Sequence, residues 1–184
     1  MNYEPLDLSG LTLVTPTRHG DERGWFSEVF RQDLFGANVA DVDFVQHNHS
    51  YSKPKGTVRG LHFQLAPRAQ GKLVRCTRGR VLDVAVDLRS SSPSFGRHVA
   101  VELTAANGRQ LWVPAGFAHG FCTLEDDCEI VYLVTDTYSP EHDRGLLWND
   151  PALAIAWPVA AEDAVLSAKD VRQPRLAELG RVFD

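Results

Sequence analysis

The sequence predicts an all-β domain, a sandwich or barrel built from short strands. Its 184 residues are enough for one well-packed domain and too few for two large ones, so residues 1–184 are expected to form a single domain. Short apolar runs recur at regular spacing, and each is bounded by Gly, Pro, Asn or Asp, which is typical of strands joined by turns. Helical periodicity is almost absent before the end of the chain. These three observations predict strands throughout, with a few short peripheral helices.

The first part of the chain contains three predicted strands, one turn and one helix. Residues 20–24, Gly-Asp-Glu-Arg-Gly, are expected to form a turn because glycine and short polar side chains interrupt regular structure. Residues 32–39 are expected to form a short helix. Extended runs are expected at residues 11–15, 25–30 and 44–50.

The central stretch, residues 56–87, concentrates polar groups within strand-like sequence. Apolar, β-favouring residues (Val58, Leu61, Phe63) stand among polar ones (Arg59, His62, Gln64, Lys72). This pattern is expected of a strand with one polar, concave face. Further on, residues 82–88 alternate apolar side chains with Asp83, Ala85 and Asp87, which fits a half-buried antiparallel strand. We expect these segments to form the floor of a site.

The last part of the chain continues the same alternation of strands and turns. A loop is expected at residues 90–96 and a strand at residues 99–103. Residues 128–135 form a long β-rich run, whose period of two places four residues on one face: Cys128, Ile130, Tyr132 and Val134. Only residues 174–179 are expected to be helical in this part.

The charge distribution excludes some partners. A net charge of −5 with mixed signs throughout gives no electrostatic reason to expect nucleic acid or an acidic membrane surface. One local group of basic residues stands against this background: Arg59, Arg68, Lys72, Arg75, Arg78 and Arg80. Such a group suits a phosphate or diphosphate better than a polymer, although scattered surface arginines would give the same pattern.

The cysteines and the N-terminus indicate where the protein works. Cys76, Cys122 and Cys128 are odd in number and widely spaced in apolar settings, so neither a disulfide framework nor a zinc site is expected. We expect them to be core residues in a reducing cytoplasm. The N-terminus has no apolar run of signal or membrane length, so a cytoplasmic protein without membrane insertion is expected.

Two segments, Gly56 to His62 and Pro114 to His119, resemble the two motifs of the cupin family of small β-barrels. The resemblance implies a cupin-type jelly-roll barrel or sandwich. In metal-binding cupins the first motif continues as His-x-His and then a Glu, which together suit a divalent transition metal. Here Gln64 and Gln70 stand at the two later positions. Because neutral amides replace an imidazole and a carboxylate, no metal is expected.

A histidine, a lysine and a tyrosine in one pocket form a workable set for removing a proton next to a carbonyl group. His62 is the type of general base best matched to neutral pH. The ammonium of Lys72 would stabilise the negative oxygen of the resulting enolate, and Tyr132 would return a proton to the opposite face. For Tyr132 a role in the core is the more common case, so both interpretations stay open at this point.

Short motifs of mixed polar and aromatic residues follow one another along nearly the whole chain. They are Asp21-x-Arg-Gly-x-Phe-x-Glu28, Gln46-x-Asn-x-Ser50, Arg59-Gly-Leu-His-x-Gln64, Gln70-x-Lys-Leu-Val74, Pro114-x-Gly-x-Ala-His-Gly-Phe121, Tyr132, Tyr138-Ser-Pro140, Trp148-Asn-Asp-Pro151 and Leu166-Ser-x-Lys-Asp170. Taken together and in this order, they resemble the dTDP-4-dehydrorhamnose 3,5-epimerase family.

The resemblance implies a cofactor-independent epimerase that inverts C3 and C5 of a dTDP-4-keto-6-deoxyhexose. It implies that His62 is the base, that Asp170 holds its tautomer, that Tyr132 is the acid, and that Lys72 lies near the keto or enolate oxygen. Tyr138 would stack on the thymine ring. The positions implied to bind substrate are Arg23, Phe26, Glu28, Gln46, Asn48, Arg59, His119, Tyr138, Asp143 and Lys169.

Asp143 departs mildly from the family, whose members often carry a longer Glu after the Tyr-Ser-Pro motif. Family members are homodimers in which the neighbour completes part of each site, so a homodimer is expected. Three alternatives stay open. They are an epimerase that inverts only C3 or only C5, a metal-dependent cupin oxygenase or isomerase, and a sugar-nucleotide-binding cupin without activity.

Overall fold

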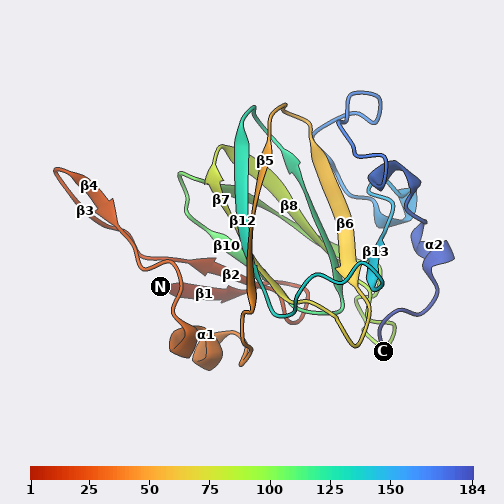
Figure 1. Cartoon of the computed structure of the whole chain (residues 1–184), viewed down its shortest axis with the longest axis horizontal. Helices are drawn as coiled ribbons and strands as arrows, with labels where there is room; N and C mark the ends of the chain where they lie inside the picture. Colours follow the sequence, from red (N-terminus) through yellow and green to blue (C-terminus); the bar gives the residue numbers. More distant parts are fainter.

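Two antiparallel sheets face each other and enclose the core between them (Figure 1). The computed structural model describes residues 1–184. The six-stranded sheet has the strand order β1-β2-β10-β7-β12-β5, and the five-stranded sheet has the order β13-β6-β11-β8-β9. Neither sheet closes on itself. The all-β prediction is therefore confirmed, in the form of an open jelly-roll sandwich.

The strands are short, as predicted. The six-stranded sheet consists of β1 (Asn2–Pro5), β2 (Thr12–Thr15), β10 (Gln110–Val113), β7 (Lys72–Arg78), β12 (Cys128–Val134) and β5 (Gln46–Ser52). The five-stranded sheet consists of β13 (Asp143–Gly145), β6 (Val58–Gln64), β11 (Phe117–Thr123), β8 (Arg80–Asp87) and β9 (His98–Thr104). Strands β1, β10, β11 and β13 were not predicted. In β1 and β13, three or four residues give too little alternation to recognise.

Helices are few and peripheral. They are α1 (Gln32–Asn38), α2 (Leu176–Leu179) and the 3-10 turns η1 (Pro151–Leu153) and η2 (Asp170–Arg172). The helix predicted at residues 32–39 is confirmed, and the one predicted at residues 174–179 is shorter than expected. None of the helices has the length and apolar character that crossing a membrane requires.

Strand β12 shows how alternation builds the core. Its residues Cys128, Ile130 and Val134 are at most 1% exposed, and Tyr132 packs from a partly buried position against the core cluster that contains Cys128 and Ile130. The face predicted for these four residues is thus confirmed. Each fully buried aliphatic side chain of this kind contributes about 1.5–3 kcal/mol relative to an exposed one.

Strand β8 corrects the prediction of a half-buried strand. Val84 and Val86 of β8, and Leu88 directly after it, pack under the C-terminal segment, so the opposite face, which carries Asp83 and Asp87, points into the sandwich. Both carboxylates have 0% exposure. They are tolerated there because each has close hydrogen-bond partners. The alternation was recognised correctly, but the cover over the apolar face was not foreseen.

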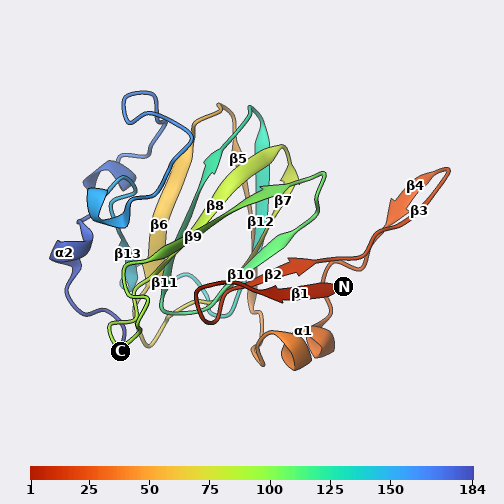
Figure 2. The ribbon, with the colours of Figure 1, turned by 180° about the vertical axis from the view of Figure 1, so that it is seen from behind.

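A two-stranded hairpin stands apart from the sandwich. It consists of β3 (His19–Asp21) and β4 (Gly24–Phe26), and both views show it projecting away from the two sheets (Figures 1 and 2). The strand predicted at residues 25–30 therefore ends at Phe26. Trp25 is 59% exposed and Phe26 is 71% exposed, which is unusual for large apolar side chains.

Candidate active site

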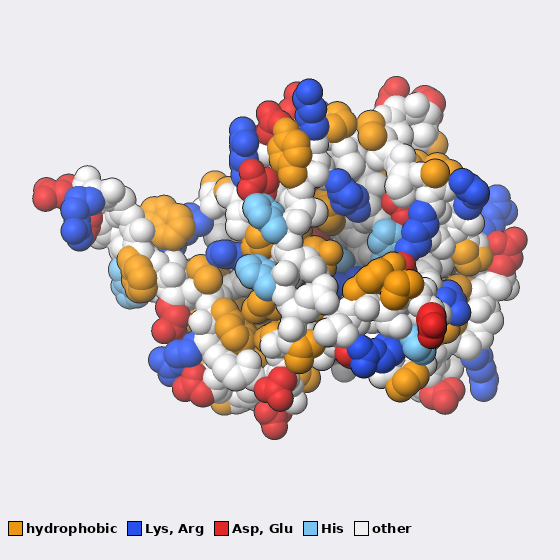
Figure 3. Space-filling model, viewed as in Figure 1, with side chains coloured by type: hydrophobic (Ala, Val, Ile, Leu, Met, Phe, Trp, Pro, Cys, Tyr) orange, Lys and Arg blue, Asp and Glu red, His pale blue; other side chains and the backbone are white.

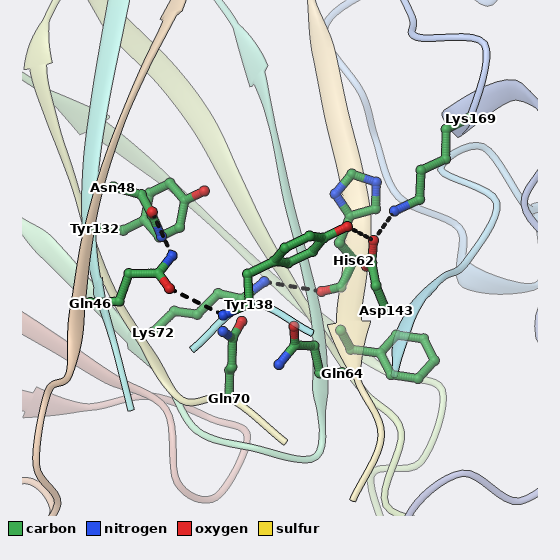
Figure 4. A pocket seen from close by; sticks show the side chains of 11 residues that line it. Gln46, Asn48, His62, Gln64, Gln70, Lys72, Tyr132, Tyr138, Asp143 and Lys169 are labelled. Carbon is green, nitrogen blue, oxygen red and sulfur yellow. Dashed lines mark hydrogen bonds and ion pairs between the residues drawn. The ribbon is translucent and has the colours of Figure 1, made fainter. Parts of the chain in front are cut away.

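A polar cavity of ≈ 300 Å³ opens between the two sheets (Figure 4). Residues of both sheets line it together with loop residues: Gln46, Asn48, His62, Phe63, Gln64, Gln70, Lys72, Tyr132, Tyr138, Asp143 and Lys169. In the space-filling view, histidine and basic side chains surround a hollow in this face of the molecule (Figure 3). Most of the site residues predicted from the sequence line this cavity.

A bulge in β6 gives this strand its polar inner face. The pairing between β11 and β6 shifts register between His119 and Phe121, next to Gly60, which has φ +126°. A Cβ on Gly60 would lie 2.6 Å from the Cα of Gly120, so only glycine fits. Because of the shift, Arg59 shares the inner side with His62, and the polar face predicted for this strand is confirmed.

His62 and Asp170 form a hydrogen-bonded pair in which Asp170 is buried and the imidazole of His62 is partly open to the cavity. His62 Nε2 lies 2.5 Å from Asp170 Oδ1, and Ser167 Oγ donates to Asp170 Oδ2 at 2.9 Å. Burial alone raises the pKa of Asp170, but the hydrogen bond and charge of His62, together with the Ser167 hydrogen bond and the charge of Lys169, outweigh burial and lower the pKa. An ionised carboxylate only accepts hydrogen bonds, so Nε2 carries the hydrogen and Nδ1 is left as the basic nitrogen.

Lys72 is a desolvated ammonium group on the cavity wall. Its Nζ donates to the backbone oxygen of His62 at 3.2 Å. Burial lowers the pKa of Lys72 from 10.5 to about 8, and the charges of Asp143 and Asp83 partly oppose this shift. A cation with so little hydration interacts strongly with any negative charge that develops beside it.

Tyr132 lies on the other side of the cavity from His62, on the facing sheet (Figure 4). It pairs in register with Asn48 of β5. Burial raises the pKa of its phenol, while the charge of Arg59 lowers it. A phenol and an imidazole therefore face each other across one cavity, as an acid and a base that act on two sides of a carbon would have to.

The mouth of the cavity is formed by Tyr138, Asp143 and Lys169. Tyr138 OH donates to Asp143 Oδ2 at 3.0 Å, and the ammonium of Lys169 forms an ion pair with the same oxygen (Figure 4). The Tyr138 side chain is 57% exposed, so most of its ring is open to a ligand. On the inner side, Gln46 Nε2 donates to Asn48 Oδ1 at 2.7 Å.

Five predicted substrate-binding residues do not line the cavity. Arg59 reaches across to β5, where it donates to Ser52 Oγ at 3.0 Å and to the backbone oxygen of Tyr51 at 2.9 Å. His119 is buried next to His62 in the sheet. The other three, Arg23, Phe26 and Glu28, lie on or next to the projecting hairpin.

The basic group noted in the sequence is dispersed in the structure. Arg68 pairs with Asp136, Arg78 with Asp127 and Glu129, and Arg80 with Glu102 and Glu125. Of the group, Lys72 alone lines the cavity, and Arg59 lies close enough to Tyr132 for its charge to lower the pKa of that phenol. Strand order separates residues that are close in sequence, so their density along the chain did not predict a cluster.

Gln64 and Gln70, at the positions of metal ligands in other cupins, are both engaged with backbone groups. Gln64 Nε2 donates to the backbone oxygen of Arg68 at 2.6 Å, and Gln70 Nε2 donates to that of Asp136 at 2.6 Å. No three His, Cys, Asp or Glu side chains come together as a metal site would require. The residues present therefore do not fit a bound metal.

Sequence reasoning missed two polar partners of the site. Ser167, which donates to Asp170, lies within the last motif, and its Ser-x-x-Asp spacing is the signal that would have identified it. Asp83 accepts from His119, whose Nε2 lies 2.9 Å from Asp83 Oδ1. A charged residue inside the apolar run of β8 was the available sign of a buried pair.

A jelly-roll sandwich that brings a histidine, a tyrosine phenol and a lysine ammonium group to one cavity has the groups that a cupin-type enzyme of acid–base chemistry needs. The family model for dTDP-4-dehydrorhamnose 3,5-epimerase matches residues 5–178. The chain belongs to this family.

Similar proteins agree with this assignment. The dTDP-4-dehydrorhamnose 3,5-epimerase of Sinorhizobium fredii is 59% identical, over 97% of this chain and 91% of its own. The dTDP-6-deoxy-D-glucose-3,5-epimerase of Legionella pneumophila, solved in complex with dTDP-4-keto-L-rhamnose, superposes with a TM-score of 0.92 at 42% identity, covering 97% and 94% of the chains. A 3'-monoepimerase from Streptomyces bikiniensis, solved with dTDP-quinovose, gives a TM-score of 0.88 at 36% identity, covering 95% and 87%.

Proposed function

We propose that the protein converts dTDP-4-dehydro-6-deoxy-D-glucose to dTDP-4-dehydro-L-rhamnose by inverting C3 and C5, without a cofactor. One observation supports this most strongly. The His62–Asp170 pair and Tyr132 lie on opposite sides of one cavity that also holds Lys72, in a chain of the epimerase family. Inversion at carbon requires a base on one face and an acid on the other, and this arrangement supplies both.

The proposed chemistry depends on the 4-keto group. His62 Nδ1 removes the proton from C3 or C5, and the C–H electron pair forms the C=C bond of an enolate, with the negative charge on the C4 oxygen. The Lys72 ammonium stabilises this charge. Tyr132 donates its proton to the opposite face of the carbon, the carbonyl re-forms, and solvent restores the protonation of both residues. Both carbons are next to C4, so one base serves both after the sugar ring shifts.

The nucleotide part of the substrate is proposed to bind at the cavity mouth. The exposed ring of Tyr138 would stack on thymine, since an aromatic face is open there. Arginine binds phosphate oxygens in pairs, so Arg59, which lies close to Tyr132, suits the diphosphate. Gln46, Asn48, His119, Asp143 and Lys169 are proposed to complete the contacts.

We propose a homodimer in which the hairpin of one protomer reaches the cavity of the other. Two features support this: the hairpin carries exposed Trp25 and Phe26, and a two-stranded hairpin on its own is only marginally stable in water. Arg23, Phe26 and Glu28 would then contribute to the neighbour's site. Light scattering should give the mass of two chains, and the mass of one chain would contradict the proposal.

We infer a cytoplasmic location from the cysteines. Cys76, Cys122 and Cys128 are buried free thiols, and no disulfide joins them. Free thiols of this kind are usual in a reducing compartment.

An epimerase that inverts a single carbon is the second candidate, because the 3'-monoepimerase of Streptomyces bikiniensis is similar over most of this chain. Product analysis distinguishes the two candidates. The substrate is incubated with the enzyme and a coupled 4-keto reductase, and the product is identified by NMR. We expect dTDP-L-rhamnose, whereas a sugar inverted at one carbon would establish the alternative.

A further inference from the structure

The segment that carries Tyr138 is held by side-chain amides instead of by backbone pairing. Residues 136–138 lie between β12 and β13, and none of them forms a hydrogen bond from its backbone to another backbone group. Strand pairing ends with Thr135, whose N–H donates to the oxygen of Gly71 at 3.1 Å. The position of Tyr138 therefore depends on the side chains around this segment.

Gln64 holds the segment with both ends of its amide. Its Oε1 accepts from the N–H of Ser139 at 2.8 Å, and its Nε2 donates to the backbone oxygen of Thr137 at 3.2 Å and to that of Arg68 at 2.6 Å. The side chain is buried, so these bonds are shielded from water. One amide is thus hydrogen-bonded to the backbone of the residues on both sides of Tyr138.

Two further glutamines form hydrogen bonds to the backbone of the same segment. Gln70 Nε2 donates to the backbone oxygen of Asp136 at 2.6 Å, and Gln46 Oε1 accepts from the N–H of Tyr138 at 3.1 Å. Figure 4 shows the three amides beside and below the Tyr138 side chain. From outside, Arg68 pairs with Asp136. The ring itself has one hydrogen bond, from its hydroxyl to Asp143.

We propose that Gln64 and Gln70 are positioning residues that hold the Tyr138 ring where a nucleobase stacks on it. This rests on the proposed function, in which Tyr138 contacts thymine. The requirement is for an amide, because Gln64 must donate and accept at the same time. A carboxylate of the same size accepts only, and it would repel the carbonyl oxygens to which the amide donates.

The test compares Gln64→Glu and Gln70→Glu with the wild type by calorimetric titration of dTDP alone. We expect about tenfold weaker dTDP binding for each, the effect of losing hydrogen bonds in a buried setting. Affinity for dTDP should fall by a larger factor than turnover at saturating substrate, because neither amide forms a hydrogen bond with His62 or Tyr132. The control is Gln32→Glu, which makes the same charge change far from the cavity. It loses a similar hydrogen bond, from Gln32 Nε2 to the backbone oxygen of Val42, and this variant should bind dTDP as the wild type does.

A second measurement separates positioning from general support of the fold. The Gln70→Glu change is repeated in a Tyr138→Ala background. If Gln70 acts through the ring, the second change should weaken dTDP binding by less than about twofold further. An equal loss in both backgrounds, or unchanged binding by both glutamate variants, would overturn the proposal. Gln70 is less buried than Gln64, so its variant carries the test if Gln64→Glu fails to fold.

The outcomes also distinguish this proposal from the proposed function. A wild type that does not bind dTDP contradicts both. The positioning role alone is contradicted if the wild type binds dTDP, Tyr138→Ala binds it more weakly, and both glutamate variants bind it as well as the wild type.

Discussion

At the scale of single residues, burial and close partners give ordinary side chains unusual acid–base properties. Asp170 stays ionised although it is only 3% exposed, because His62 and Ser167 donate to it. Lys72 shows the opposite balance, since it is desolvated and has no carboxylate in direct contact. Burial therefore destabilises the ammonium form of Lys72 relative to the neutral amine, and it strengthens the attraction of that ammonium to an enolate oxygen.

Replacing Asp170 with Asn should lower turnover by about 10²- to 10⁴-fold, the usual contribution of a general base. The amide keeps the size of the side chain but removes the charge that fixes the His62 tautomer and stabilises its protonated form. Binding of dTDP should change little, because Asp170 contacts only His62 and Ser167 through its side chain. Steady-state kinetics and dTDP titration check both statements. Asp163→Asn, an exposed site in the same segment, is the control, and normal turnover of Asp170→Asn would contradict its role.

The lowered pKa of Lys72 predicts two opposite pH effects between about pH 8 and 10.5. Turnover should fall as pH rises above about 8, because Lys72 loses its proton. The free energy of unfolding should gain a contribution over the same range, because the unfolded chain binds a proton that the folded chain has released. The nearby charges that enter this balance are Asp143, Asp83 and Lys169.

The measurement compares the pH dependence of turnover and of urea unfolding in the wild type and in Lys72→Met. The variant should lose most activity at every pH and should lack the additional stability at high pH. Identical stability profiles for the two proteins would show that Lys72 titrates at its ordinary pKa.

At the scale of elements, the interior strand β8 and the bulged strand β6 determine which polar side chains lie inside the sandwich. The polar face of β6 was predicted correctly. The bulge at Gly60 brings Arg59 to the same side of the strand as His62. The alternation of β8 was recognised, but its polar face is inside. That reversal could not be predicted, because it depends on the distant C-terminal segment that covers Val84, Val86 and Leu88.

Asp87 at the end of β8 should be important for stability. It accepts hydrogen bonds from Arg89 at 2.7 and 2.8 Å and from Ser92 and Ser94, both at 2.7 Å. Burial raises its pKa, but these bonds outweigh burial and lower the pKa from 3.8 to about 2. Its contribution to stability is therefore complete above about pH 4 and is lost as pH falls toward 2.

Asp87→Ala should reduce the free energy of unfolding at pH 7 by about 3–5 kcal/mol, as expected when one partner of a buried ion pair is removed. Urea denaturation followed by circular dichroism measures the change. Asp33→Ala removes an exposed carboxylate paired with Arg31 and should leave the midpoint nearly unchanged. Equal stability of Asp87→Ala and the wild type would contradict the role of this network.

At the scale of the whole molecule, the proposed catalytic groups all come from one chain, and the projecting hairpin carries the groups that we propose a second chain uses. The fold class, the cavity residues of β5, β6, β7 and β12, and the projecting motif were all recognised in the sequence. Asp170 was identified only by family resemblance, because nothing local links it to His62, 108 residues earlier in the chain. The partners of Gln64 and Gln70 were not predictable either, since they depend on how the segment after β12 folds back.

Exchange of hairpins between protomers predicts complementation between two inactive variants. Arg23→Ala impairs the hairpin and His62→Ala removes the base, so each should be inactive or nearly so alone. In an equal mixture that has exchanged subunits, half of the dimers are mixed and one of their two sites is intact, which gives about one quarter of wild-type activity. No recovery after confirmed subunit exchange would show that Arg23 and His62 do not act in a site shared between chains.

The most direct test is proton NMR of dTDP-4-dehydro-6-deoxy-D-glucose incubated with the enzyme in deuterated water. The proposed mechanism predicts that the signals at both C3 and C5 disappear as deuterium replaces hydrogen, and that His62→Ala abolishes both losses. Exchange at neither carbon in the wild type, or undiminished exchange in His62→Ala, would contradict proton abstraction by this residue next to the 4-keto group.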